Sequence, residues 1–187
     1  MSPDPPAGLG GWRPELLGEP GTVRPVLRAP DGGLSRPAEP VDPADPKTVA
    51  LAADLIATMR VSPGCVGLAA PQIGVGARVF AVDVTGHPKA LTTHGPFVLC
   101  NADIRQATRW RPAREGCMSV PDLTGDVKRA GRVVLVGQLP GTAREVTLAT
   151  DGFEARAVQH EIDHCAGLLF LDRVAGAHAL HPRQVYL

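Results

Sequence analysis

Two stretches of the chain are predicted to be helices, the first from its pattern of apolar residues. In the first, apolar side chains recur every three or four positions from Val49 to Met59, which would bury one face of a helix. Asp45-Pro46 supplies an N-cap acceptor followed by proline, and the Ser-Pro-Gly at 62–64 ends the pattern. The second stretch starts at 151–154, which resembles a capping box, and ends at Gly167.

Between these stretches, β-branched residues and alternation predict strands. They cover 78–84, 97–100, 102–110, 133–136 and 146–149. The last two flank a Leu-Pro-Gly-Thr turn and are expected to pair. A helix, several strands and a second helix predict an α+β fold, a mostly antiparallel β-sheet packed around a central helix.

Proline divides the chain unevenly, because 11 of the 19 prolines fall in the first 46 residues. Residues 1–45 are therefore expected to form an extended, partly mobile N-terminal arm, of which only 25–28 would dock. One folded domain is predicted over 46–175, followed by a C-terminal tail over 176–187.

Charge and composition narrow the function classes. Nineteen basic and nineteen acidic residues cancel, so no electrostatic footprint indicates nucleic-acid or membrane partners. The first residues lack the pattern of a signal peptide, and a cytoplasmic protein is expected. The four cysteines form no C-x-x-C pair and are expected to be thiols.

The helix that ends at Gly167 carries the sequence Gln-His-Glu-Ile-Asp-His. His160 and His164 are four residues apart, so both imidazoles can reach one metal ion from one helix face, with Glu161 beside the first ligand. The alternative is a helix with polar residues on its outer face. The usual downstream third ligand is absent, because its position is Phe170 and no Glu follows Glu161, so the ligand should lie upstream.

One upstream cysteine, Cys117, is the candidate for this ligand. Cys117 has Gly116 before it and Ser119 two residues after it, and it lies between two predicted strands. This context suits a thiolate presented into a site, whereas most lone cysteines are small buried hydrophobes. Cys100 and Cys165 have apolar neighbours and are expected to be of that buried kind.

Residues 65–72 are rich in small side chains, typical either of a tight connection or of backbone lying against a substrate, with Gln72 as an amide donor.

Three separated motifs, G-L-A-A-P-Q (67–72), E-G-C-M-S (115–119) and Q-H-E-I-D-H (159–164), resemble those of the peptide deformylase family in order and spacing. The resemblance extends from about residue 47 to about 173. It implies that the metal is held by the cysteine of the second motif and both histidines of the third, which are Cys117, His160 and His164.

The resemblance also implies roles around the metal. Glu161 would be the general acid/base, and the Gln72 side chain and the Met118 backbone N–H would donate to the developing oxyanion. Glu115 and Arg129 match family positions that steady the site. The implied metal is one divalent ion, Fe²⁺ in the native enzyme, with Zn²⁺, Ni²⁺ and Co²⁺ as alternatives that thiolate softness permits.

The implied reaction is hydrolytic removal of the formyl group from the N-terminal formyl-methionine of newly made polypeptides. The partners would be formyl-methionyl nascent peptides, with transient proximity to the ribosome. The Gly67-Leu68 backbone could pair with an extended peptide as an added strand. Side chains expected to line the methionine pocket, or equally to pack in the core, are Val66, Phe153, Ala157 and the stem of Arg156.

The chain departs from the family pattern at Cys65, where glycine is usual, and at Cys165 and Met118, where leucine is usual. Cys65 could alter the pocket rim or place an oxidisable thiol near the metal. Two alternatives to deformylation stay open. One is an amidase of the same mechanism acting on another formylated or acylated substrate, and the other is a non-catalytic binding module that retains the fold.

Overall fold

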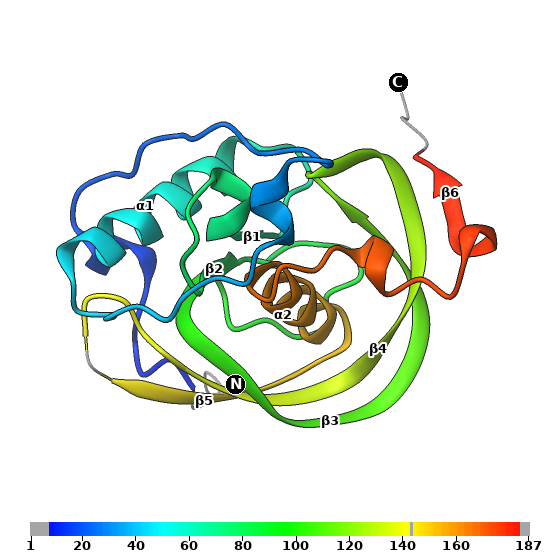
Figure 1. Cartoon of the computed structure of the whole chain (residues 1–187). Helices are drawn as coiled ribbons and strands as arrows, with labels where there is room; N and C mark the ends of the chain where they lie inside the picture. The colour runs from blue at the N-terminus through cyan, green and yellow to red at the C-terminus, as the bar shows by residue number, and fades with distance from the viewer. Residues whose placement is uncertain (1–7, 143, 184–187) are drawn as a thin grey trace.

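The computed structural model describes residues 8–142 and 144–183, which form an α+β fold (Figure 1). The described α-helices are α1 (Pro46–Val61) and α2 (Gly152–Cys165). The strands are β1 (Gly67–Ala69), β2 (Val79–Val82), β3 (Phe97–Cys117), β4 (Val120–Gln138), β5 (Glu145–Asp151) and β6 (Leu180–Pro182). All pair antiparallel in the order β1-β2-β3-β4-β5, and β6 pairs with β4, so the predicted fold class is confirmed.

Strands β3 and β4 form a long curved ribbon that sweeps around α2 (Figure 1). The two strands predicted over 97–100 and 102–110 are parts of the single strand β3, which continues to Cys117. Register shifts follow Cys100 and Ile104, and Asn101 has a positive φ of 53°, so the side-chain alternation is broken there. The exposed polar stretch after Trp110 is held by backbone pairing rather than by buried side chains.

Helix α1 forms where the sequence predicts it. The Asp45 carboxylate accepts a hydrogen bond from the Lys47 backbone N–H at 2.8 Å, and Ser62 is the C-cap residue. Ala52, Leu55, Ile56 and Met59 lie in the main hydrophobic core, which also contains β1, β2 and parts of β3, β4, β5 and α2. A smaller cluster of Cys117, Val120, Val127 and Phe170 supports the end of β3.

Helix α2 lies at the centre of the molecule, and its cap differs from the predicted one (Figure 1). The Asp151 side chain makes no cap hydrogen bond. Glu154, the expected reciprocal partner, instead accepts from the His94 backbone N–H at 2.8 Å and from the Thr150 hydroxyl at 2.7 Å. The capping-box interpretation is therefore wrong, because a loop 60 residues away takes the Glu154 carboxylate.

The described part of the N-terminal segment packs closely on the domain. Leu9, Trp12, Leu17 and Leu34 are buried, and the Trp12 indole N–H donates to the Pro140 carbonyl at 3.3 Å. The prediction that only 25–28 would dock is wrong, because these widely spaced apolar residues show no periodic pattern in the sequence. The domain boundaries at 45 and 175 stay a prediction, and residues 1–7 lie outside the described ranges.

The C-terminal segment also joins the sheet. Strand β6 pairs with residues 123–125 of β4, and the Arg183 backbone N–H donates to the Asp122 carbonyl at 2.9 Å. Within the described ranges, the helices are too short or too polar to cross a membrane.

Candidate metal centre and cleft

Three side chains meet at one point between the ribbon and α2. Cys117 is the last residue of β3, and His160 and His164 lie one turn apart on α2. The Cys117 Sγ lies 3.3 Å from the His164 Nε2, and that nitrogen lies 3.2 Å from the His160 Nε2. The three donor atoms all lie within 4.8 Å of one another. The upstream ligand expected from the sequence is thus beside the two histidines.

This donor set fits a four-coordinate divalent ion. Imidazole nitrogens lie about 2.0–2.1 Å and thiolate sulfurs about 2.3 Å from such an ion, which puts neighbouring donors roughly 3.3–3.6 Å apart. The two short separations in the triad are close to that range. Burial lowers the pKa of His164 well below its usual value, so its imidazole is neutral, as a metal ligand must be. Three protein ligands leave a fourth position open.

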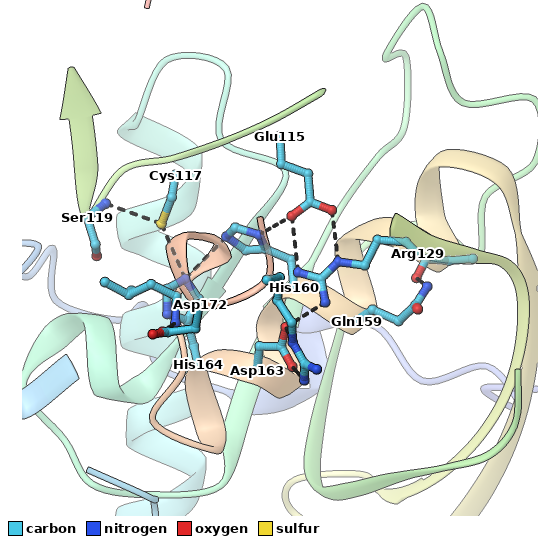
Figure 2. Close-up of polar contacts among 12 residues, drawn as sticks. Glu115, Cys117, Ser119, Arg129, Gln159, His160, Asp163, His164 and Asp172 are labelled. Carbon is cyan, nitrogen blue, oxygen red and sulfur yellow. Dashed lines mark hydrogen bonds and ion pairs between the residues drawn. The ribbon is translucent and has the colours of Figure 1, made fainter. Parts of the chain in front are cut away.

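His160 is oriented by a carboxylate on the neighbouring strand (Figure 2). Its Nδ1 lies 3.1 Å from Glu115 Oε2, which assigns the proton to Nδ1 and turns Nε2 toward the triad. The Arg129 guanidinium donates to both Glu115 oxygens, at 2.8 and 3.1 Å. Burial alone would raise the pKa of Glu115, but the His160 and Arg129 hydrogen bonds outweigh it and hold this pKa at about 2.

The ion-pair chain continues beyond Arg129 to Asp163 (Figure 2). Arg129 Nη1 lies 2.5 Å from Asp163 Oδ2, and Arg173 donates to both oxygens of Asp163, at 2.7 and 3.1 Å. Asp163 is buried, so the two guanidiniums satisfy a carboxylate that would otherwise be costly to bury. The chain fixes α2 against β4 at the level of the histidines.

Glu161 lies at the inner wall of the site. Its side chain is 3% exposed, and its Oε2 is buried without a hydrogen-bond partner among the described residues. Burial raises its pKa to about 7, with the charge of Glu115 acting in the same direction and the charges of His160 and Arg129 opposing it. A carboxylate with a pKa near neutrality can both accept and return a proton.

Gln72 points its amide into the site from the 3₁₀-helix η3 (Ala70–Ile73). Its Oε1 accepts from the Ala69 N–H at 2.9 Å, which fixes the amide so that Nε2 faces inward. Nε2 donates to the Ser119 hydroxyl at 3.1 Å and lies 3.6 Å from the Cys117 sulfur. Met118 and Ser119 form the two-residue turn between β3 and β4, so the Met118 backbone lies directly after the cysteine.

Two backbone contacts from the N-terminal segment hold the elements that carry Gln72 and Met118. The Leu27 N–H donates to the Gln72 carbonyl at 2.7 Å, and the Ala29 N–H donates to the Ser119 carbonyl at 2.8 Å. The segment therefore ties η3 and the β3–β4 turn together behind the metal triad.

A cleft of about 540 Å³ opens onto the triad. Val66, Phe153, Arg156 and Ala157, the four residues suggested for a methionine pocket, line this cleft together with Gly67. Leu68 does not, because its side chain is fully buried in the main core. Strand β1 is the edge strand of the sheet, so its second edge is not paired within the sheet.

The four cysteines differ in chemistry. Cys100 and Cys165 are buried, as expected, and burial raises the pKa of each to about 12. Cys65 lines the cleft and donates to the Gly67 carbonyl at 3.1 Å. Burial, and then the charge of Glu161, raises the pKa of Cys65 to about 12, and Cys65 is not among the three side chains whose donor atoms converge.

Sequence reasoning missed several residues at the site. Asp163 stands inside the third motif and could have been identified from its place between the two histidines. Ser119 likewise stands inside the second motif, whereas Arg173 carries no such signal. His87 could not be predicted either, because it comes from the loop between β2 and β3 and stacks on Phe153 with ring centroids 4.0 Å apart.

Comparison with known proteins places this geometry in one family. The family model described as polypeptide deformylase matches residues 23–179. The peptide deformylase of Halothermothrix orenii is 41% identical over 149 residues, 80% of this chain and 92% of that protein. That of Acidothermus cellulolyticus is 43% identical over 152 residues, 81% of this chain and 79% of that protein.

Solved structures agree. The class I type b peptide deformylase from Acinetobacter baumannii, in the structure with Met-Ala-Ser bound, is 33% identical with a TM-score of 0.74, covering 81% of this chain and 99% of that one. The Thermotoga maritima peptide deformylase is 31% identical with a TM-score of 0.74, covering 83% of this chain and 99% of that one.

Proposed function

The chain belongs to the peptide deformylase family and removes the N-formyl group from newly made polypeptides by hydrolysis, and we propose the following roles for its residues. Cys117, His160 and His164 hold one divalent ion. The convergence of these three donors with Glu161 and Gln72 is the observation that carries the proposal.

When bound by these residues, the ion would supply the Lewis acidity that lets water attack an amide carbonyl near neutral pH. Glu161 accepts the proton of the attacking water, which its unpaired Oε2 and its pKa of about 7 allow. It then returns that proton to the departing amine of methionine. Without this return the amine would leave as an unstable anion.

Gln72 and the Met118 backbone N–H donate to the carbonyl oxygen as negative charge develops on it. The Gln72 amide is already oriented by its hydrogen bonds with Ala69 and Ser119, so the donor is in place before the charge develops. Glu115 and Arg129 keep the His160 ring in place.

The methionine side chain enters the part of the cleft lined by Val66, Phe153, Ala157 and the stem of Arg156. The peptide backbone lies along the open edge of β1 at Gly67, as an added strand. The native metal is Fe²⁺, as the family resemblance implies, and the thiolate of Cys117 also permits Zn²⁺, Ni²⁺ and Co²⁺. The enzyme acts in the cytoplasm, in transient proximity to the ribosome where its substrates emerge.

The test is turnover of formyl-Met-Ala-Ser by protein purified without oxygen and loaded with Fe²⁺, followed by free-amine release beside Glu161→Gln. Turnover that collapses in the variant, at an unchanged one ion per chain, is the expected result. Bound metal without turnover would redirect the assignment to another formylated substrate. Failure to bind any divalent ion would refute the site. Reloading with Zn²⁺, Ni²⁺ and Co²⁺ ranks the metals.

A further inference from the structure

The walls of the cleft carry an excess of positive charge, although the whole chain is neutral. Four basic side chains line it (Lys89, Arg114, Arg156 and Arg183), against two carboxylates (Glu115 and Glu161). Asp126 pairs with Arg114 at 2.6 Å, and Glu115 is itself neutralised by Arg129 and His160. Among the described residues, no carboxylate forms an ion pair with Lys89, Arg156 or Arg183.

Lys89 reaches the cleft on a loop that is fastened to the start of α2. The His94 Nδ1 lies 2.6 Å from Glu154 Oε2, and the Thr92 hydroxyl donates to Asp151 Oδ1 at 2.7 Å. The stacking of His87 on Phe153 adds a third attachment. The loop is thus attached to the start of α2 at three places, and Lys89, which it carries, lines the cleft.

Arg156 lies on α2, one turn before His160, and its guanidinium is incompletely satisfied. Nη2 donates to the Arg111 carbonyl at 3.2 Å. Nη1 is buried with no acceptor among the described residues. A buried donor without an acceptor is unfavourable, and a carboxylate is the acceptor that a guanidinium binds most strongly.

Arg183 comes from a third element, the segment after β6. Its Nη1 lies 3.5 Å from the Cys117 carbonyl oxygen, and Nη2 lies 3.3 Å from where a β-carbon on Gly116 would be. The pairing of β6 with β4 therefore brings this guanidinium beside the metal-ligand strand. Scattered surface cations are commonly only solvated, but here three segments far apart in sequence bring three cations to one cleft.

On the basis of the proposed function, we propose that Lys89, Arg156 and Arg183 make this enzyme prefer formyl-methionyl peptides with aspartate or glutamate among the residues directly after the methionine. Attraction across a partly desolvated cleft is stronger than in bulk water, and it raises the encounter rate of oppositely charged ligands. Because the formyl group reacts at the triad and the charges act on downstream residues, the preference falls on kcat/KM through KM.

The test uses C-terminally amidated formyl-Met-Ala-Xaa and formyl-Met-Xaa-Ala, with Xaa as Glu, Gln or Lys, so that only the side chain changes the peptide charge. At low salt, we expect kcat/KM for Glu to exceed that for Lys by about tenfold, with Gln between. In about 0.5 M salt the ratio should shrink to about twofold or less, because exposed charges are screened.

The Glu-to-Lys ratio is taken within each variant, so that a general loss of activity cancels. Lys89→Gln, Arg156→Gln and Arg183→Gln should each lower the ratio about twofold, and the triple variant should bring it close to one. Arg105→Gln removes the same charge from an exposed position outside the cleft and should leave the ratio unchanged. Equal kcat/KM for Glu and Lys, or a ratio that the three substitutions do not move, would overturn the inference.

Calorimetric binding of the same peptides to metal-loaded Glu161→Gln separates this inference from the activity itself. If the wild type turned over none of the peptides, deformylation would be refuted, while a binding preference for Glu in this variant would still support the basic cleft. Equal binding of Glu and Lys peptides would refute the charge preference in either case.

Discussion

Gly67 and Glu161 are in direct contact across the floor of the cleft. A β-carbon at Gly67 would lie 2.9 Å from the Cδ of Glu161, closer than real β-carbons approach other atoms. The backbone φ of Gly67 is not in the left-handed region, so the need for glycine is steric. The proposed acid/base residue therefore owes its position to a missing side chain on β1.

We predict that Gly67→Ala pushes the Glu161 carboxylate away from the proton it must accept. The kcat should fall by about 10²-fold or more, since that is the usual contribution of general acid/base catalysis. Metal content and thermal stability should stay near the wild-type values. Gly76→Ala is the matched control, because a β-carbon there meets no atom within 4 Å. A kcat within about threefold of wild type for Gly67→Ala would contradict the prediction.

Gln72→Ala should lower kcat by about 10²–10³-fold with little change in KM, because the amide acts mainly on the charge that develops in the transition state. Ser119→Ala removes the acceptor of one Gln72 N–H but keeps the Gln72 donor, so kcat should fall by less than about tenfold. Steady-state kinetics of both variants with formyl-Met-Ala-Ser, at equal metal content, checks this order. A larger fall in kcat for Ser119→Ala than for Gln72→Ala would exclude Gln72 as the oxyanion donor.

The pH profile should carry an acid limb that belongs to Glu161. Burial raises its pKa from 4.5 to about 7, and a cation bound beside it lowers that value again. As the carboxylate must be ionised to accept a proton, kcat/KM should rise with pH through an apparent pKa between 4.5 and about 7. An assay under constant ionic strength and metal occupancy measures it. An acid limb below pH 4.5 would assign the titration to a different group.

Glu115 should stabilise the fold above pH 4.5 and lose this effect in acid. Its folded pKa of about 2 lies below the ordinary 4.5, so its contribution is complete above pH 4.5 and disappears as pH falls toward 2. The difference between these two pKa values corresponds to about 3 kcal/mol in the free energy of unfolding. In urea titrations of metal-stripped protein, the stability gap between wild type and Glu115→Gln should narrow from pH 6 to pH 3. Glu145→Gln, an exposed strand residue, should show no such narrowing.

Cys117→Ala should lose bound metal in dialysis against a chelator, whereas Cys65→Ala should keep one ion per chain. The difference follows from geometry, because among the described cysteines only Cys117 has its sulfur grouped with the ring nitrogens of both histidines. Elemental analysis after dialysis measures it, with near-ultraviolet circular dichroism to show that both variants fold. If Cys65→Ala lost the metal while Cys117→Ala kept it, Cys65 rather than Cys117 would be the ligand.

The histidine pair of the metal centre could be predicted from sequence because its information is local, with His160 and His164 adjacent on one helix face. The missing downstream donor placed the third ligand upstream, and the family resemblance assigned it to Cys117. The cap of α1 was equally local. By contrast, the hydrogen bonds of Glu154 at the start of α2 depend on His94. The residues beside Glu154 in the sequence do not show that its carboxylate will bind a loop 60 residues away.

Strand β3 shows a second limit. Its last third, from Arg111 to Gly116, is polar and largely exposed, and it is a strand only because its backbone pairs with β4. The N-terminal segment shows a third, since Trp12 and Leu34 are buried as single residues in an irregular chain. Neither backbone pairing nor isolated anchoring leaves a periodic pattern to detect.

The enclosure of α2 has a consequence for how this protein can change. Within 152–165 only Gly152 is exposed, and the buried polar residues are matched individually, Glu154 to His94, Gln159 to the Ala130 backbone and Asp163 to Arg129. Helix α1 keeps solvent-facing positions such as Lys47 and Ala50. A library saturating both helices should return many active variants from the outer face of α1 and very few from any face of α2. Sequence drift in this enzyme is therefore confined to its periphery, and the helix that bears the histidines is the part least free to vary.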